Sequence, residues 1–195
     1  DKLVLYRNHR FTLYKGERLE DMIQSIKKNG VIRPIYVRTM ENGKYEILSG
    51  HNRVYATGQA GITSVPAVVK TDLSDEDAEI YVVETNLIQR GFKDLKISEQ
   101  AFAVGLRYSK LFDERKLKGI NDELYLIENG KPNPNADVPP EHSTTRDATA
   151  EQYGISSATV ARLLRVNKLI DEFKELVDKE NIKLRSAVDI SFLIY

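Results

Sequence analysis

A strand-to-helix turn at residues 49–53 combines residue types that suit the binding of an anion. The apolar strand pattern at 45–48 runs into Ser49 and Gly50, and a helical pattern begins at His51. Glycine lets the backbone turn tightly without a Cβ clash, and the first amides of the next helix direct their N–H groups and the positive end of the helix dipole at the turn. Arg53 adds a guanidinium fork that fits phosphate oxygens. The stretch therefore predicts a nucleotide-phosphate cradle, with an ordinary turn and a surface arginine as the alternative.

A second polar group lies at the end of a predicted helix that begins near Ser74. Asn86, Gln89 and Arg90 are three and four residues apart, so in a helix they share one face. Glu84 lies half a turn away but could reach the same cavity. Asn and Glu oxygens suit Mg²⁺ beside the phosphates of a substrate, and Arg holds phosphate oxygens. The alternative is a solvated helix end.

Residues 144–166 have the pattern of a helix-turn-helix. Ala150 is small enough for two helices to cross closely, Gly154 takes the turn, and Ile155, Val160 and Leu163 are apolar where the two helices would pack. Such a motif places its second helix in the major groove of DNA. The candidate DNA contacts are hydroxyl and cationic residues that suit base edges and phosphates: Thr145, Ser156, Ser157, Thr159, Arg162, Arg165 and Lys168. The alternative is a plain helical hairpin in a bundle.

Composition is that of an ordinary globular protein. The chain has 195 residues, 41% hydrophobic and 30% charged, with 29 basic residues balancing 29 acidic ones. The absence of cysteine excludes disulfides, thiolate zinc sites and cysteine nucleophiles from this sequence. We expect no membrane span, because no apolar run reaches the roughly 18 residues required, and we expect a cytoplasmic location. The sequence begins at Asp1 and stops in an apolar run, so we expect it to be part of a longer protein.

The elements that must position these residues follow from periodicity and turn signals. Residues 1–70 are expected to form a small α/β unit with a hairpin turn at 41–44, strands at 3–14 (one or two), 32–38, 45–48 and 65–70, and helices at 17–29 and 51–60. Pro34 predicts that 32–38 is an edge strand or that the proline stands at the start of the strand. Further helices are expected at 74–86, 98–111, 113–128, 171–179 and 184–193, with a long exposed loop at 131–140.

The order of motifs resembles the ParB family, most closely its branch from plasmids and conjugative elements of Gram-positive bacteria. The matching segments are Gly-Val-Ile-Arg-Pro-Ile at 30–35, Ser-Gly-His-Asn-Arg at 49–53, Ala-Gly-Ile-Thr-Ser-Val-Pro-Ala-Val-Val at 60–69 and Glu-Thr-Asn-Leu-Ile-Gln-Arg at 84–90, followed by the helix-turn-helix. The resemblance covers residues 12–193. It raises the weight of the phosphate-cradle interpretation, because a fingerprint in context is more specific than a single glycine turn.

The resemblance implies an α+β fold: a small N-terminal domain of ParB/sulfiredoxin type at 1–92, then an all-α DNA-binding domain at 93–195 with the helix-turn-helix at 144–166. The C-terminal dimerisation domain of the family is not in this sequence. In the family, the N-terminal domain binds cytidine triphosphate (CTP) with Mg²⁺, and the helical domain reads a palindromic centromere-like site on double-stranded DNA. Nucleotide closes a homodimer into a clamp that slides on DNA, and a ParA-type ATPase segregates the complex. A nucleoid- or plasmid-associated protein of plasmid partition or chromosome segregation is therefore expected.

Family roles can be carried over by position. Ser49, Gly50, His51, Asn52 and Arg53 would form the triphosphate loop. Gly30 would line the base or ribose, Glu84 (the candidate catalytic residue) and Asn86 would lie at the metal and triphosphate, and Gln89 and Arg90 would lie beside them. The usual loop of the family is Gly-Glu-Arg-Arg, whereas this chain has Gly-His-Asn-Arg, and the 84–90 stretch carries one inserted residue. The missing glutamate and the missing first arginine weaken the expectation of slow CTP hydrolysis more than the expectation of CTP binding.

Two other functions stay open. A sequence-specific transcription or nucleoid regulator could keep the helix-turn-helix without nucleotide control. An enzyme on the same fold, such as a small-molecule kinase, would need a catalytic carboxylate that His51 and Asn52 do not supply, and sulfiredoxin chemistry would need a cysteine.

Overall fold

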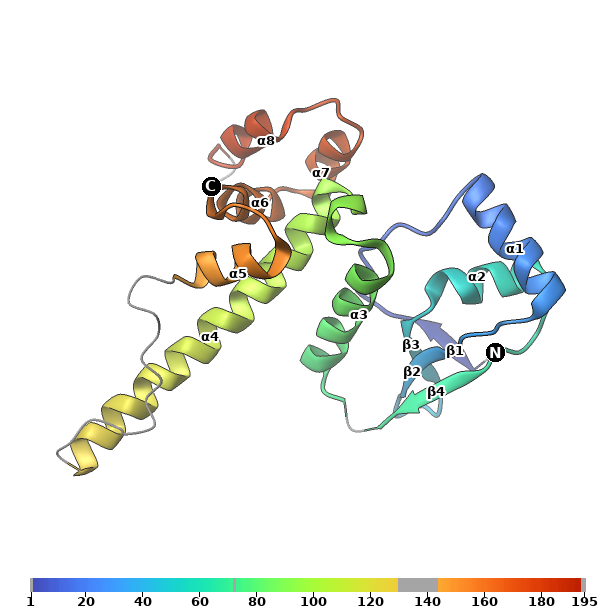
Figure 1. Ribbon diagram of the computed structural model, residues 1–195, viewed down its shortest axis with the longest axis horizontal. Helices are drawn as coiled ribbons and strands as arrows, with labels where there is room; N and C mark the ends of the chain where they lie inside the picture. The colour runs from blue at the N-terminus through green and yellow to red at the C-terminus, as the bar shows by residue number, and fades with distance from the viewer. Residues whose placement is uncertain (1, 72, 130–143, 194–195) are drawn as a thin grey trace. The chain divides into compact units, whose positions relative to one another are not determined.

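The computed structural model describes residues 2–71, 73–129 and 144–193. The chain divides into two compact units, Asp1–Gly91 and Phe92–Tyr195 (Figure 1). The first unit combines a mixed sheet with helices, and the described part of the second is helical. The fold is thus α+β, as the sequence predicts.

The first unit is built on a sheet of four strands in the order β1-β3-β2-β4. β1 (Leu3–Leu5) pairs in parallel with β3 (Tyr45–Ser49), β3 is antiparallel to β2 (Ile35–Thr39), and β2 is parallel to β4 (Ala67–Lys70). The hairpin between β2 and β3 turns at Gly43, which has φ 72°. The turn predicted at 41–44 is confirmed, and β3 lies inside the sheet with its C-terminal end leading into the next helix.

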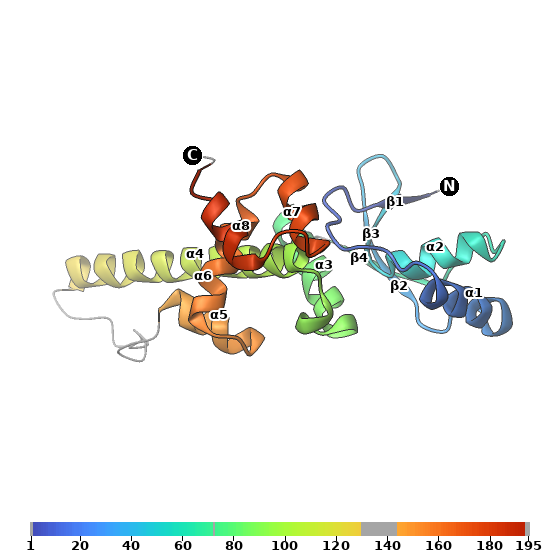
Figure 2. The same ribbon diagram turned by 90° about the horizontal axis from the view of Figure 1, so that it is seen from above.

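Three helices accompany this sheet. α1 (Glu17–Asn29) and α2 (His51–Gln59) lie side by side (Figures 1 and 2), and α3 (Asp75–Arg90) contacts β3. Ser74 caps α3 by accepting a hydrogen bond from the amide of Asp77, which satisfies one of the first amides of the helix. Ile35, Val37 and Ile47 form a buried cluster in the sheet.

The second unit begins with a short 3₁₀ turn (Phe92–Asp94) and the long helix α4 (Ile97–Asn129). Helices α5 (Thr145–Tyr153), α6 (Ser157–Asn167), α7 (Asp171–Asp178) and α8 (Leu184–Ile190) follow. α4 contacts α5, α6 and α7, while α6 also contacts α8. The fully buried side chains of Val104, Val160, Leu163 and Val166 form the centre of the core of this unit.

The structure decides three details of the sequence prediction, and a fourth lies outside the described residues. Residues 6–14 are not a strand, because β1 ends at Leu5. The helices predicted at 98–111 and 113–128 are one continuous helix, α4. Pro34 stands just before β2, which lies inside the sheet, so the edge-strand alternative is wrong and the strand-start alternative is confirmed. The loop predicted at 131–140 lies outside the described residues. Across the described ranges, no helix has the length and apolarity to cross a membrane.

Candidate functional site

The turn between β3 and α2 has the backbone geometry that the sequence predicts. Gly50 adopts φ 100° and ψ 20°, in the left-handed region. A Cβ at this position would lie 2.6 Å from Cγ2 of Ile35, which is fully buried. Only glycine fits there without a shift of the sheet. No side chain caps α2, so the amides of its first turn keep their N–H groups for another acceptor.

A cavity of about 370 Å³ opens at this turn. Its walls come from the turn, from the C-terminal end of α3, from α1 with the segment before it, and from the segment before β2. Residues of both predicted polar groups line it together: Ser49, Gly50, His51, Asn52, Arg53, Asn86 and Gln89. The three-dimensional structure therefore brings together two stretches that are more than thirty residues apart.

Other residues of the proposed site lie differently. Gly30 lines a second cavity of about 730 Å³, which shares Tyr14, Met22, Arg33 and Arg53 with the first. The α3 residues Glu84 and Arg90 line neither cavity. Glu84 is two residues from Asn86, about 200° around the helix, so it leaves the face that Asn86 presents.

The sequence analysis did not single out Tyr14, Met22 or Ile88 as site residues, although all three line the first cavity. Met22 has the spacing of a core residue of α1, and Tyr14 ends the segment 3–14, whose loose alternation predicts a strand. Arg33, which lies in the matching segment 30–35, lines both cavities. No local signal in the sequence marks these residues, because their place depends on how distant segments pack.

Arg53 is fixed against the backbone beside the cavity. Its Nη1 donates hydrogen bonds to the carbonyl oxygens of Arg33, at 2.7 Å, and Pro34, at 2.5 Å. Burial lowers the pKa of Arg53, and the positive charge of Arg33 lowers it further. Two guanidinium groups that line one cavity and repel each other would be stabilised by an anion between them.

His51 is buried at the start of α2 and is only 4% exposed. Its ring lies against that of His9 in a tilted arrangement, with ring centroids 3.7 Å apart and 33° between the ring planes. Burial, with a further contribution from His9, lowers the pKa of His51 to about 3, so the ring is neutral at pH 7. Its Nε2 has no hydrogen-bond partner among the described residues. An unsatisfied buried nitrogen is costly, by about 1–3 kcal/mol.

Gln89 joins α3 to the turn, whereas the side-chain amide of Asn86 bonds back to α3 itself. Gln89 Nε2 donates to Ser49 Oγ at 3.1 Å, and Asn86 Nδ2 donates to the carbonyl of Val82 at 2.8 Å. No carboxylate lines the cavity within the part of the chain that the structure describes, and no cluster of three or more potential metal-binding side chains occurs there. Because Mg²⁺ is usually held by one or two carboxylates together with phosphates, these residues do not fit a dedicated magnesium site.

The helical pair α5–α6 lies where the sequence predicts the helix-turn-helix. Gly154 makes the turn with φ 62°, Ser156 caps α6 through the amide of Thr159, and Ala150, Val160 and Leu163 are buried between the helices. The Ser157 hydroxyl donates to the carboxylate of Asp147, which also forms a capping box with Thr144.

The predicted DNA contacts therefore fall into two groups. The hydroxyls of Ser156, Ser157 and Thr159 already take part in bonds that shape the turn. Arg162 and Lys168 are exposed, while Arg165 stacks on the ring of Phe192, with Cζ 3.7 Å from the centroid. Thr145 starts α5 and bonds Thr149 through its carbonyl. Arg162 and Lys168 are thus the candidates best placed to reach a phosphate.

Comparison with known proteins gives the family. Residues 5–86 match the model of the ParB N-terminal domain. The chain is 30% identical over 186 residues to a nucleoid occlusion protein of Geobacillus sp. (strain WCH70), covering 95% of this chain and 54% of the relative. It is 31% identical over 176 residues to a nucleoid occlusion protein of Bacillus mycoides (strain KBAB4), covering 90% and 49%. The chain spans about half the length of these curated relatives.

Among solved structures, the chain is similar to the C-terminally truncated partitioning protein ParB of Caulobacter crescentus. The form complexed to the centromeric parS site is 23% identical, with a TM-score of 0.49 over 97% of this chain and 81% of that one. The form complexed with CTP-gamma-S is 25% identical, with a TM-score of 0.40 over 97% and 87%. These scores are too low to support a structural argument. The sequence matches identify residues 5–86 as a ParB N-terminal domain, and the chain belongs to the ParB family.

Proposed function

We propose that this chain is the nucleotide- and DNA-binding part of a partition or nucleoid occlusion protein, and that its N-terminal domain binds CTP. The observation that carries the proposal is the cavity at the first turn of α2. It combines uncapped helix amides, a glycine that no other residue can replace without strain, and the guanidinium of Arg53. Together these groups offer hydrogen-bond donors and positive charge to a phosphate chain.

Each part of the nucleotide has candidate partners in the proposed site. The amides of residues 51–53 and the guanidinium of Arg53 would bind phosphate oxygens, and Gln89 would close the site from α3. The second cavity, with Gly30 in its lining, offers room for the ribose and base because it shares a wall with the first. The choice of cytosine rests on the family resemblance. No metal is part of this proposal, because the lining of the first cavity does not fit a magnesium site; a role of Asn86 as a magnesium ligand stays a prediction.

The proposal concerns binding and includes no hydrolytic step. Glu84, the predicted catalytic residue, does not line the cavity, and the residue at the position of the family glutamate is His51, which is neutral at pH 7. No carboxylate is among the residues that line the first cavity in the described part of the chain, and this gives no support to a kinase.

For the second unit, we propose that α6 binds the major groove of double-stranded DNA. The buried contacts between α5 and α6 and the capping by Ser156 hold the two helices as one body, and Arg162 and Lys168 are exposed on α6 and at its end. A palindromic site, a homodimeric clamp and a ParA-type ATPase partner are the corresponding family properties and belong to the same proposal.

The test of nucleotide binding is calorimetric titration of the chain with CTP, ATP, GTP and UTP. We expect CTP to bind more tightly than the other three, and Arg53→Ala to weaken CTP binding at least tenfold, since a charge-assisted phosphate contact contributes about 1.5–3 kcal/mol. Arg185→Ala, an exposed arginine of α8, is the matched control and should leave the affinity unchanged. Thermal melting shows whether each variant is folded.

A regulator without nucleotide control is the second candidate, favoured by the change from Gly-Glu-Arg-Arg to Gly-His-Asn-Arg in the loop. It predicts that no nucleotide binds while DNA binding persists. A measurable heat of binding on titration with CTP would exclude this second candidate.

A further inference from the structure

Residues 6–14, which make up most of the segment between β1 and α1, have no regular secondary structure but are closely attached to the first unit. We call these residues the strap. Tyr6 and Phe11 anchor it, because their side chains are only 4% and 3% exposed. Most connecting segments lie on the surface and move more than the elements they join. Two buried aromatic side chains in nine residues indicate that the strap has a fixed position.

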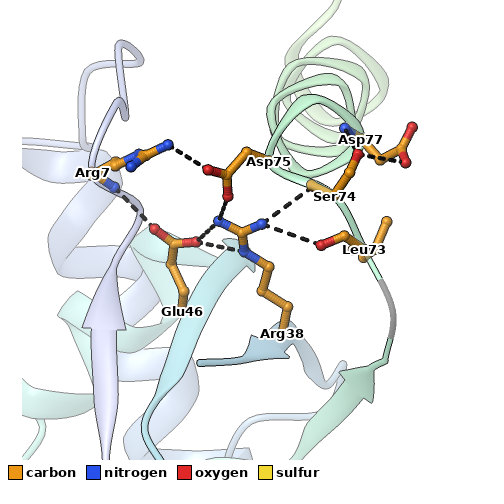
Figure 3. A network of polar contacts seen from close by, with 7 residues as sticks. All are labelled: Arg7, Arg38, Glu46, Leu73, Ser74, Asp75 and Asp77. Carbon is orange, nitrogen blue, oxygen red and sulfur yellow. Dashed lines mark hydrogen bonds and ion pairs between the residues drawn. The ribbon is translucent and has the colours of Figure 1, made fainter. Parts of the chain in front are cut away.

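The start of the strap is held by a network of ion pairs (Figure 3). Arg7 Nη2 pairs with Asp75 Oδ2 at 2.7 Å, and the Arg7 amide donates to Glu46 Oε1 at 3.3 Å. Arg38 joins the two acids, with 2.7 Å to Glu46 Oε2 and 2.7 Å to Asp75 Oδ1. Arg38 and Glu46 are largely buried, so this part of the network is screened less than a surface pair. The network connects the strap to the sheet and to the start of α3.

The end of the strap is attached to residues of the proposed nucleotide site. The Tyr14 amide donates to Asn52 Oδ1 at 2.8 Å, and Arg90 Nη2 donates to the carbonyl oxygen of Thr12 at 2.5 Å. Arg18 and Arg90 approach the ring of Tyr14, with Cζ 3.9 Å and 5.0 Å from its centroid. Tyr14 lines both cavities. The strap therefore forms part of the wall of the proposed site.

These bonds decide which atoms the site can present to a ligand. Because the Tyr14 amide is a donor, it takes the oxygen of the Asn52 carboxamide, and the opposite end of that group is the donor Nδ2. A donor is the end that suits an anion. In the middle of the strap, His9 stacks on His51 and holds its ring over the first turn of α2. The strap thus contacts His51, Asn52 and Arg90.

We propose that the strap, residues 6–14, is a positioning element for the anion-binding groups of the cavity, and that His9 is a positioning residue that acts through His51. This inference rests on the nucleotide-binding function proposed above. Binding groups gain affinity when neighbouring contacts fix their orientation before the ligand arrives, because less conformational freedom is lost on binding.

The experiment compares three variants of the whole chain: His9→Ala, His9→Phe and Asn8→Ala. His9→Ala removes the stack on His51, whereas His9→Phe keeps an aromatic ring there. Asn8→Ala alters an exposed neighbour in the strap and is the matched control. Calorimetry measures the affinity for CTP and for inorganic tripolyphosphate, which contains only the anionic part. Amide hydrogen exchange by NMR follows Tyr14 as a reporter of the strap and Ile47 as a reporter of the sheet.

We expect His9→Ala to weaken both ligands on the order of tenfold, as removal of an outer contact to a binding residue commonly does. His9→Phe should recover most of the affinity, and Asn8→Ala should match the unaltered chain. The Tyr14 amide should exchange faster in His9→Ala while that of Ile47 does not change. This pattern separates local release of the strap from loss of the fold.

Three results would overturn the inference. Unchanged affinity in His9→Ala would show that the strap does not position the site, and tighter binding would show that the strap competes with the ligand; in both cases the proposed function survives. If the unaltered chain binds neither CTP nor tripolyphosphate, the proposed function fails and the positioning role fails with it.

Discussion

At the scale of single residues, the turn at Gly50 is set by sterics. Its φ of 100° is unfavourable for residues with a side chain, and a Cβ would enter the space of the Ile35 side chain at 2.6 Å. The backbone strain and the clash with Ile35 would both arise where the backbone approaches the cavity. The amides at the start of α2 therefore depend on this residue for their direction.

Gly50→Ala should destabilise the first unit by about 2–5 kcal/mol, the combined cost of a left-handed backbone and an overpacked neighbour. Gly58 of the same helix is the control, because a Cβ there meets nothing within 4 Å. Gly58→Ala should stabilise the chain by about 0.5–1 kcal/mol. Urea unfolding monitored by circular dichroism measures both changes. Equal stabilities of the two variants would show that the turn tolerates a side chain.

Among the charged residues of the cavity, Arg53 has a structural and a binding role at once. Its Nη1 holds the backbone at Arg33 and Pro34, while the guanidinium lines the cavity. For this reason, the CTP titration of Arg53→Ala must be read beside its melting temperature. A lower affinity at unchanged stability assigns the loss to the phosphate contact.

At the scale of elements, Asp147 joins α5 to α6. It completes the capping box with Thr144 and accepts the hydroxyl of Ser157 in the first turn of α6. These hydrogen bonds, first that of Ser157 and then those of Thr144, lower the pKa of Asp147 from 3.8 to about 2. The ionised carboxylate therefore stabilises the packing of the two helices.

The lowered pKa of Asp147 in the folded chain determines how the stability of the second unit depends on pH. The unfolded chain takes up the proton at a higher pH than the folded chain, so the stabilisation is complete above about pH 4 and is lost as the pH falls towards 2. We expect Asp147→Asn to lower the melting temperature of the second unit by a few degrees at pH 7, and the difference from the unaltered chain to shrink below pH 4. Asp189→Asn, on the exposed face of α8, is the control. A difference that stays constant from pH 7 to pH 2.5 would contradict the assignment.

α4 shows how an element can differ from its sequence pattern. The segments at 98–111 and 113–128 look like two helices because the polar residues around Asp113 interrupt the apolar spacing. The one residue between the two segments, Phe112, is neither a proline nor a glycine and does not break a helix. The backbone continues through it, and α4 runs unbroken from Ile97 to Asn129.

At the scale of the whole molecule, the proposed nucleotide site and the proposed DNA-binding helices lie in different compact units. Each function should therefore respond to changes in its own unit. The chain spans about half the length of its curated relatives. Any coupling between nucleotide binding and DNA binding in a full-length protein is therefore part of the proposal.

We expect Arg162→Ala to weaken binding to double-stranded DNA about five- to tenfold and to reduce the slope of log affinity against log salt by about 1, as removal of one phosphate contact does. CTP affinity should not change in this variant. Arg185→Ala is again the control, and fluorescence anisotropy with a labelled duplex over a range of salt concentrations is the measurement. An unaltered salt slope would remove Arg162 from the interface.

The sequence by itself determined the local features. The glycine turn at 49–53, the hairpin at 41–44, the capped start of α3 and the α5–α6 pair were all predicted, because each depends on residues within a few positions of one another. The order of these motifs was also enough to indicate the family. The whole site needs more than this, since its walls come from separate parts of the chain.

Only the tertiary structure decided what surrounds the turn. It placed Tyr14 and Met22 in the wall of the cavity, left Glu84 out of it, and turned residues 6–14 from a predicted strand into the strap. It also showed that His51 stacks on His9, a residue 42 positions away in the chain. These contacts leave no periodic signal in the sequence, because they form only when distant segments pack against each other. A sequence pattern indicates which face of a helix or strand is buried, but it does not indicate which residue packs against that face.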